Sequence, residues 1–231
     1  KTLVSRSSPS RTLYTVQAIP REISGHRISV LERAQGRVPS VVFSQNYVQK
    51  NRDDPTSFTT APSVSRKVLL TTERDQLLSI LDGVGTPFFC SSTFPLEVRA
   101  GPGSSKIIEQ GKVLPIKLHR DEDGKILNLV LAWAEDGTEL IVQVPIVYKG
   151  EDSCPGLEKG GVLRRIRSSL KFMSPAEHIP AKIEIDVSKL DIGEGIWMNQ
   201  VSVHPSLKLL SKNDMLPVCK IMLSKQPENH P

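Results

Sequence analysis

At 231 residues, of which 38% are hydrophobic and 5% aromatic, the chain is long for one small domain and comfortable for two domains that each bury a core. The low aromatic content argues against a surface that stacks single-stranded bases, and no apolar run approaches the roughly 20 residues that cross a bilayer. We therefore expect a soluble globular protein without a membrane partner.

Charge is concentrated at one end of the chain. Residues 1–50 contain eight Lys and Arg against two acids, a net charge of +6, whereas residues 51–231 carry −1. Most of these bases are arginines, whose planar guanidinium groups match phosphates and base edges better than an ammonium group does. This end favours a structured nucleic acid as its partner, although an ordinary solvated basic face would have the same composition.

The basic end is predicted to form a strand, a short helix and a second strand. Residues 13–20 alternate weakly, as a strand does, and residues 26–35 carry apolar side chains three apart on one side of a helix. Arg27 and Arg33 are expected to point away from that apolar side. The second strand begins near Pro39, so basic groups fringe a helix and a strand.

Residues 44–66 are polar and contain prolines, which predicts an exposed excursion with poor order. A helix is expected next, capped by Thr72 and running to Leu81. Beyond it, Asp-Gly turns separate alternating apolar runs and indicate hairpins. The expected strands span residues 87–98, 112–119, 126–133 and 138–148.

A second domain is expected to begin near residue 144. Residues 162–172 alternate as one strand, with Arg165, Arg167 and Lys171 on one side. This basic stripe either touches RNA or forms a solvated sheet face, and the second reading is favoured because neighbouring acids cancel its field. Those acids are Glu158, Glu177, Glu184 and Asp186.

Two separate motifs indicate a known family. In the basic end, arginines with glycine and serine precede a strand that opens Gly36-Arg37-Val38-Pro39, and far downstream lie PAEHIP at 175–180 and KIEIDVSKLDIG at 182–193. In this order they resemble the ribosomal protein L-twenty-five family, in particular its long members of the general stress protein CTC type. The resemblance spans residues 15–224.

The resemblance implies a mainly β fold, with a small N-terminal β-barrel-like domain that carries one or two helices, followed by a C-terminal β-domain. The expected parts are a basic flexible tail at 1–12, a 5S rRNA-binding domain at 13–143, a C-terminal β-domain at 144–224 and a flexible tail at 225–231. It further implies a structural component of the large ribosomal subunit that binds 5S rRNA at its internal loop E and contacts neighbouring rRNA and ribosomal proteins.

The same resemblance places an RNA-binding set on the first domain, in which the glycines permit close backbone approach or special dihedral angles. The set is Arg21, Gly25, Arg27, Ser29, Arg33, Arg37 and Asn128. The chain departs from the family pattern at Val30 and Leu31, where the family has an arginine pair, and at Val130, where it presents an aspartate. Fewer direct RNA contacts are therefore expected than in bacterial members.

No motif for catalysis, a metal or a cofactor accompanies these features. The acidic turn at 121–124 is followed by none of the glycine and glutamate that a calcium loop requires, and no nucleophile motif or Gly-rich phosphate loop is present. The three cysteines, at 90, 154 and 219, have no metal or redox spacing and are expected to be free thiols. We expect no enzyme, no cofactor and no small-molecule substrate.

Two alternatives remain open. The first 12 residues contain no acid and are rich in Ser, Thr and Arg, which is typical of organelle transit peptides. This favours a mitochondrial ribosome of plant type over the bacterial cytoplasm. In function, the alternative to a ribosomal protein is a β-rich protein-binding adaptor that presents edge strands, with the basic end as a solubilising arm.

Overall fold

The computed structural model describes residues 14–45, 47–49, 58–60, 66–211 and 215–223. The fold is mainly β, as expected, and it divides into two compact units. The first unit holds the described residues up to 45 and those from 66 to 135, and the second holds the remainder. The expected tails at 1–12 and 225–231 lie outside the described residues.

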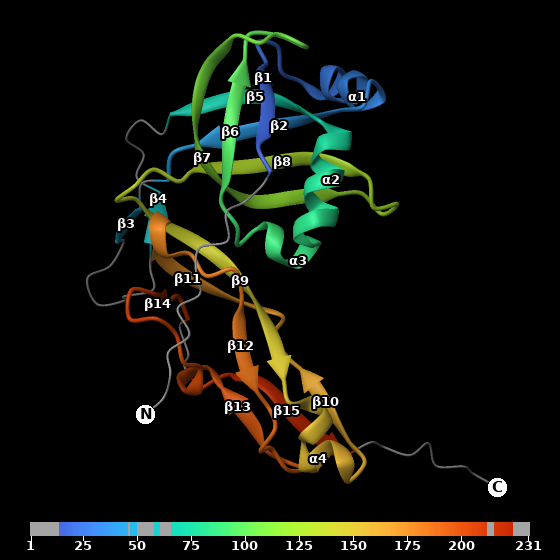
Figure 1. Ribbon diagram of the computed structural model, residues 1–231, viewed down its shortest axis with the longest axis vertical. Coiled ribbons are helices and arrows are strands. Elements are labelled where there is room, and N and C mark those ends of the chain that lie inside the picture. Colours follow the sequence, from blue (N-terminus) through green and yellow to red (C-terminus); the bar gives the residue numbers. More distant parts are fainter. Residues whose placement is uncertain (1–13, 46, 50–57, 61–65, 212–214, 224–231) are drawn as a thin grey trace, which may run out of the picture. The chain divides into compact units, whose positions relative to one another are not determined.

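The first unit is a closed six-stranded barrel (Figure 1). Its strands neighbour one another in the order β1, β5, β2, β8, β7, β6, and two contacts in the ring are parallel, β1 with β6 and β2 with β8. The elements are β1 Val16–Pro20, α1 His26–Ala34, β2 Arg37–Phe43, β5 Lys67–Glu73, α2 Arg74–Val84, α3 Thr86–Phe89, β6 Phe94–Arg99, β7 Ile107–Arg120 and β8 Ile126–Trp133.

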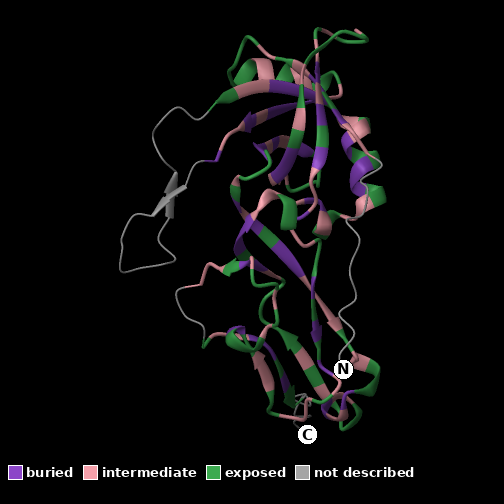
Figure 2. Ribbon diagram, turned by 60° about the vertical axis from the view of Figure 1, so that its left-hand side comes forward, coloured by how far each residue is buried: buried purple, intermediate pink, exposed green. Residues whose placement is uncertain are grey.

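Alternation along the strands fills the barrel with apolar side chains, which appear as the buried bands of Figure 2. Every strand contributes to this core, which includes Val16, Val38, Leu70, Leu96, Val113 and Leu129. The intervening residues face outward. A slip of one residue in any strand would therefore exchange the core for the surface.

Helix α2 begins differently from the prediction, and the expected Thr72 cap is wrong. Thr72 lies within β5 and points into the barrel, where its hydroxyl is 3.0 Å from that of Ser40 on β2. Each hydroxyl also lies within hydrogen-bond distance of the Val38 carbonyl oxygen, so the two buried polar groups have partners. The helix begins at Arg74, and Glu73 before it makes no side-chain cap.

The strand expected over 87–98 is wrong in its first half, which forms the short helix α3. Gly85, at φ 87°, ends α2, and Pro87 suits the first turn of a new helix because its missing N–H has no partner there. Phe89 on α3 is buried against Phe94 at the start of β6, with their ring centroids 5.3 Å apart.

Of the two Asp-Gly hairpins, one is confirmed and one is wrong. Gly124, at φ 80°, turns β7 into β8, which pair antiparallel. Gly137, at φ 82°, also turns the chain, but the next strand does not pair with β8. Both edges of β8 are already taken by β7 and β2 in the closed ring, so the chain passes on to the second unit.

The second unit contains a four-stranded sheet in the order β12, β9, β11, β14 and a three-stranded sheet in the order β10, β15, β13. β9 is central to the first of these, pairing antiparallel with β11 and parallel with β12. The elements are β3 Tyr47–Gln49, β4 Phe58–Thr60, β9 Glu139–Lys149, α4 Pro155–Glu158, β10 Gly161–Arg165, β11 Ser169–Pro175, β12 Ile183–Asp186, β13 Gly195–Trp197, β14 Lys208–Leu209 and β15 Pro217–Leu223. The 143/144 boundary expected from the sequence falls inside β9.

The single strand expected over 162–172 is wrong. β10 pairs with β15 in one sheet and β11 pairs with β9 in the other, with a break at 166–168 between them. The break forms because the amides of both Ile166 and Arg167 donate to the Val218 carbonyl oxygen, which turns the backbone out of the β10 register. The predicted basic stripe is thereby divided between two sheets.

The excursion expected over 44–66 includes the antiparallel pair β3 and β4, and its residues 50–57 and 61–65 lie outside the described residues. The three cysteines are free, with Cys154 and Cys219 buried. No helix in the described chain is long and apolar enough to span a membrane.

A glycine on β7 provides a test of barrel packing. A Cβ on Gly111 would lie 2.7 Å from Cζ3 of Trp133, whose side chain is buried, so Gly111→Ala should lower the free energy of unfolding by about 1–3 kcal/mol. Gly101→Ala is the matched control, because a Cβ there meets nothing within 4 Å, and it should change stability by less than about 0.5 kcal/mol. Urea unfolding followed by tryptophan fluorescence measures both, and equal stability of the two variants would contradict this packing.

Candidate nucleic-acid interface

Helix α1 lies between two glycines and packs against β2 (Figure 1). Gly25, at φ 141°, precedes the helix and Gly36, at φ 78°, follows it, and L side chains rarely adopt either conformation. None of the helix residues is buried, and Leu31, expected on an inward apolar side, is 56% exposed. The predicted orientation of the helix is therefore wrong, and polar contacts hold α1 in place.

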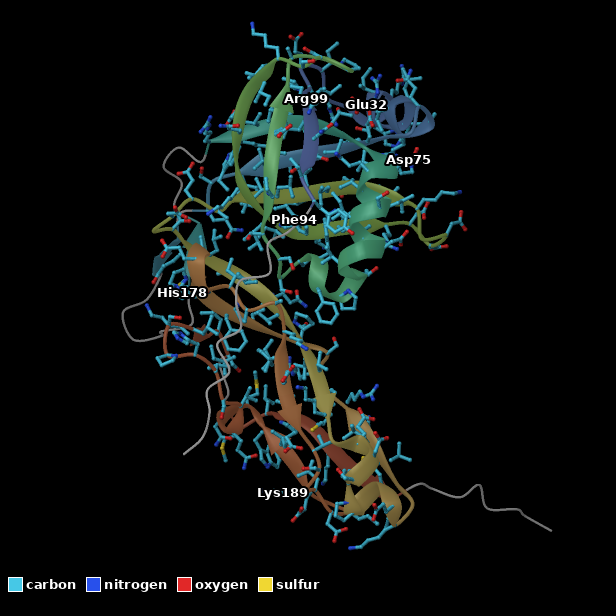
Figure 3. The ribbon with its side chains drawn as sticks, viewed as in Figure 1. Glu32, Asp75, Phe94, Arg99, His178 and Lys189 are labelled. Atoms are coloured by element: carbon cyan, nitrogen blue, oxygen red, sulfur yellow. The ribbon has the colours of Figure 1, made fainter. Side chains whose placement is uncertain are left out.

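The first of these contacts is a cluster around Arg21. Its Nε donates to the Ile23 carbonyl oxygen at 3.0 Å, and its Nη1 lies 3.3 Å from Oε2 of Glu32 on α1 (Figure 3). The two side chains are only 11% and 14% exposed. Thr71 donates to the other oxygen of Glu32, and Ser29 Oγ accepts from Arg21 at 3.5 Å. Arg21 and Ser29 therefore serve to attach α1 to the barrel.

Arg33 makes the second attachment, and it does not point away from the barrel as predicted. Its Nη1 donates to the Leu127 carbonyl oxygen on β8 at 3.4 Å, and its own carbonyl oxygen accepts from the Arg74 guanidinium. The side chain is half-buried. This contact places the Arg33 guanidinium beside Asn128, the next residue on β8.

Asn128 belongs to the outer side of the β7–β8 hairpin. It lies opposite His119, whose Nδ1 is hydrogen-bonded to the Asn128 amide oxygen. An amide oxygen only accepts, so His119 carries its proton on Nδ1 in this pair. One step along the same face, Lys117 lies opposite Val130, and Val130 lies beside Val41 of β2.

Arg27 differs from the other arginines of the segment because it is exposed on α1. Within the described residues it makes no hydrogen bond or ion pair. We use the name hairpin–helix face for Arg27, Arg33, Lys117, His119, Asn128 and Val130. Five of these side chains carry hydrogen-bond donors, and three of those are cationic at neutral pH.

Arg37 lies apart, at the rim of the barrel. It opens β2 opposite Glu73 of β5, and with Arg99 it lines a cavity of about 150 Å³ beneath the turn at 101–103. Arg99 itself is paired with Glu97 at 3.0 Å. The rim is therefore more nearly neutral than the hairpin–helix face.

The hairpin–helix face can hold phosphates and polar edges but has no arrangement for bond-breaking chemistry. Its cations suit phosphate oxygens, and the amide and imidazole suit hydroxyls or base edges. Among the described residues no cluster of three or more His, Cys, Asp or Glu could hold a metal ion.

Comparison with known proteins adds the family. Residues 139–225 match the family described as Ribosomal protein TL5, C-terminal domain. A large ribosomal subunit protein bL25 of Rhizorhabdus wittichii is 30% identical over 190 residues, which cover 81% of this chain and 77% of that protein. The chain belongs to the bL25 family. This is a family of ribosomal structural proteins and not of enzymes.

Two further bL25 proteins are similar over most of the chain. That of Erythrobacter litoralis is 28% identical over 189 residues, covering 82% of this chain and 70% of that protein. That of Rhodopseudomonas palustris is 25% identical over 205 residues, covering 88% and 73%. The similarity therefore includes the barrel as well as the second unit, which the family match covers.

Within this bL25 chain the structure brings together only some of the residues singled out from the sequence. Arg33 reaches β8 beside Asn128, and Arg27 is exposed on the same helix as Arg33. Arg21 and Ser29 form an internal cluster, and Arg37 is at the rim. Sequence reasoning missed Lys117 and His119. The signal for them was available in the hairpin register, because outward positions on β7 face Asn128 and Val130 across the Asp-Gly turn.

Arg21 and Arg27 should respond oppositely to truncation. Arg21→Ala leaves Glu32 largely buried without its cation, so the free energy of unfolding should fall by about 1–3 kcal/mol. Arg27→Ala removes an exposed side chain without a partner and should change it by less than about 0.5 kcal/mol. Urea unfolding of the two variants gives the comparison. Equal losses would mean that Arg21 does not anchor the helix.

Proposed function

We propose that the chain is a structural constituent of the large ribosomal subunit that binds 5S rRNA, in the region of its internal loop E, through the hairpin–helix face. Family membership supports the ribosomal part of this proposal. The observation that carries the RNA part is that Arg27 is exposed on α1 and has no side-chain partner among the described residues, while the β7–β8 hairpin offers further cations and hydrogen-bond donors.

The chemistry of this face suits an irregular RNA helix. Such RNA is bound through its shape, its phosphates and its shallow minor groove with 2′-hydroxyls. Arg27 and Lys117 would contact phosphates, while His119 and Asn128 would contact hydroxyls or base edges. Because His119 gives its Nδ1 proton to Asn128, its Nε2 is free to accept, and the Asn128 amide nitrogen is free to donate.

The protein-binding adaptor is less well supported for the first unit. Partners that add a strand need an open sheet edge, and the closed barrel pairs both edges of each of its six strands. As the setting we propose a mitochondrial ribosome of plant type, on the acid-poor composition of residues 1–12. The bacterial cytoplasm is the alternative, and the relatives named above are bacterial.

Charge reversal at Arg27 tests the RNA face. Arg27→Glu should weaken binding of 5S rRNA by about tenfold or more and lower the magnitude of the log–log salt slope by about 1, because one phosphate contact is lost. Lys189→Glu, in the second unit (Figure 3), makes the same charge change away from this face and should leave the affinity unchanged. Filter binding at several salt concentrations provides the data. If Arg27→Glu binds normally, the RNA face lies elsewhere.

Val130 tests whether the departure from the family pattern weakens binding. It is half-exposed on the barrel's outer side, opposite Lys117, so an aspartate should fold there and pair with the lysine. Val130→Asp should leave 5S rRNA affinity unchanged or tighten it, because an RNA donor would gain an acceptor worth about 1–3 kcal/mol if buried. Thermal melting checks the fold, and a folded variant that binds more weakly would contradict the assignment.

A further inference from the structure

Strands β9 and β11 are neighbours in the four-stranded sheet of the second unit (Figure 1). A polar groove lies over these two strands. Its volume is about 430 Å³, and it is open to solvent. Gln143 of β9 and Lys171 of β11 are cross-strand neighbours on its floor, and the loop at 166–168 forms one wall. Arg167 extends from that loop. The polar lining is completed by Ser168, Ser169 and Ser211.

The side chains of Arg167 and Lys171 have no acidic partner among the described residues, whereas several other bases of this unit form ion pairs. Arg165 pairs with Glu151, Lys208 with Glu139, and Lys159 with Asp191. These pairs are all outside the groove, and no acid lines it. The groove therefore carries two positive charges that have no acidic contact among the described residues.

Glu184 is one acid of this unit whose charge is neutralised by bases outside the groove. Hydrogen bonds from Lys149 and Lys182 hold the pKa of its carboxyl at about 2, far below its ordinary value. A carboxylate held between two lysines contributes little negative field at the groove. Of the four acids that the sequence placed against the basic stripe, Glu184 is thus already compensated.

The loop at 166–168 is fixed in place by its backbone. The amides of Ile166 and Arg167 both donate to the Val218 carbonyl oxygen at 3.0 Å, and the Ser168 carbonyl oxygen accepts from the Ile146 amide at 2.9 Å. The Tyr148 hydroxyl donates to the Arg167 carbonyl oxygen at 2.9 Å, and burial raises the pKa of that hydroxyl to about 12. The donor therefore stays protonated across the neutral range, and Arg167 is presented from a rigid support.

We propose that this groove binds the sugar–phosphate backbone of a second stretch of ribosomal RNA, apart from 5S rRNA. Arg167 would grip a phosphate through two parallel N–H donors and Lys171 would neutralise a neighbouring phosphate. The serine hydroxyls and the Gln143 amide would contact phosphate oxygens or 2′-hydroxyls. The inference rests on the ribosomal placement proposed above but not on the hairpin–helix face.

An acidic peptide fits the groove less well than RNA does. One edge of β11 is paired with β9 along its whole length, and the other is paired with β14 at Phe172 and Met173, so little edge is left for an added strand. The lining offers hydroxyls, an amide and two cations, and of its apolar residues Leu170 and Met198 are buried. That composition is typical of phosphate and sugar contacts.

The full-length protein with two charge-reversal pairs provides the test. The groove pair is Arg167→Glu with Lys171→Glu. The control pair is Arg164→Glu with Lys220→Glu, two exposed bases that face each other across β10 and β15 in the other sheet of the unit. The probes are bacterial long large-subunit rRNA freed of 5S rRNA, 5S rRNA alone, and polyglutamate.

The groove pair should weaken binding of the long rRNA by about tenfold or more and lower the magnitude of its salt slope by about 1.5, as expected for two lost phosphates. The control pair should change neither. Affinity for 5S rRNA should be unaffected by the groove pair and reduced by Arg27→Glu. If only the predictions for 5S rRNA fail, the hairpin–helix face is wrong. If the groove pair loses binding to the long rRNA alone, the groove is supported.

Three results would overturn the proposal. The first is that the groove pair binds the long rRNA normally. The second is that the groove pair and the control pair weaken rRNA binding equally, which would show only a general electrostatic field. The third is that the groove pair loses polyglutamate binding while it keeps rRNA binding, which would indicate an acidic protein as the partner. If the charge-reversed groove pair melts early, Arg167→Gln with Lys171→Gln decides instead. That neutral pair should fold and still lose the larger part of the affinity.

Discussion

Closure of the barrel is the constraint on which the first unit depends. Four of its neighbouring strand pairs are antiparallel, but the ring is completed by parallel contacts of β1 with β6 and of β2 with β8. Parallel contacts join strands far apart in the chain, so their register cannot be adjusted by a local turn. With the register fixed, Leu129 and Leu131 face inward and Asn128 and Val130 outward. The outward positions of Asn128 and Val130, which belong to the proposed RNA face, are therefore a consequence of how the ring closes.

Helix α1 completes that surface without joining the core. It has no buried residue, and its attachment consists of the Arg21–Glu32 cluster and of Arg33 reaching β8. Polar attachment leaves the remaining sides of the helix unconstrained, which is why Val30 and Leu31 can stand exposed at 46% and 56%. The arginines of this segment therefore have two separate roles. Arg21 attaches the helix to the barrel, Arg27 is the proposed RNA contact, and burial distinguishes the two.

Local sequence signals predicted the elements whose determinants are themselves local. Alternation located β1, β7 and β8 but not β5, for which no strand was predicted. The glycine of the acidic turn at 121–124 adopts the left-handed conformation that the hairpin requires. Failures occurred where a distant residue decides. The local sequence at Thr72 predicts a helix cap, but its contact with Ser40 inside the barrel places it in a strand. The run after Pro87 predicts a strand, but it forms a short helix whose Phe89 packs against Phe94. The candidate site shows the same difference between local and distant determinants. The special dihedral angles of its glycines could be predicted, but the pairing of Arg21 with Glu32 could not.

The distribution of charge shows most clearly what the sequence alone does not predict. Counting bases and acids along the chain assigned the positive field to residues 1–50 and gave a nearly neutral remainder, in which the acids were expected to cancel the basic stripe. Cancellation at short range depends on which groups are in contact. The fold pairs Arg165 with Glu151 but gives Arg167 and Lys171 no acidic partner within the part of the chain that is described. Salt screens the field of distant acids, so the acids in direct contact with a base determine how far its charge is cancelled. A unit with little net charge can therefore hold a cationic groove, because net charge sums over all residues of the unit whereas binding depends on the charges at the groove itself.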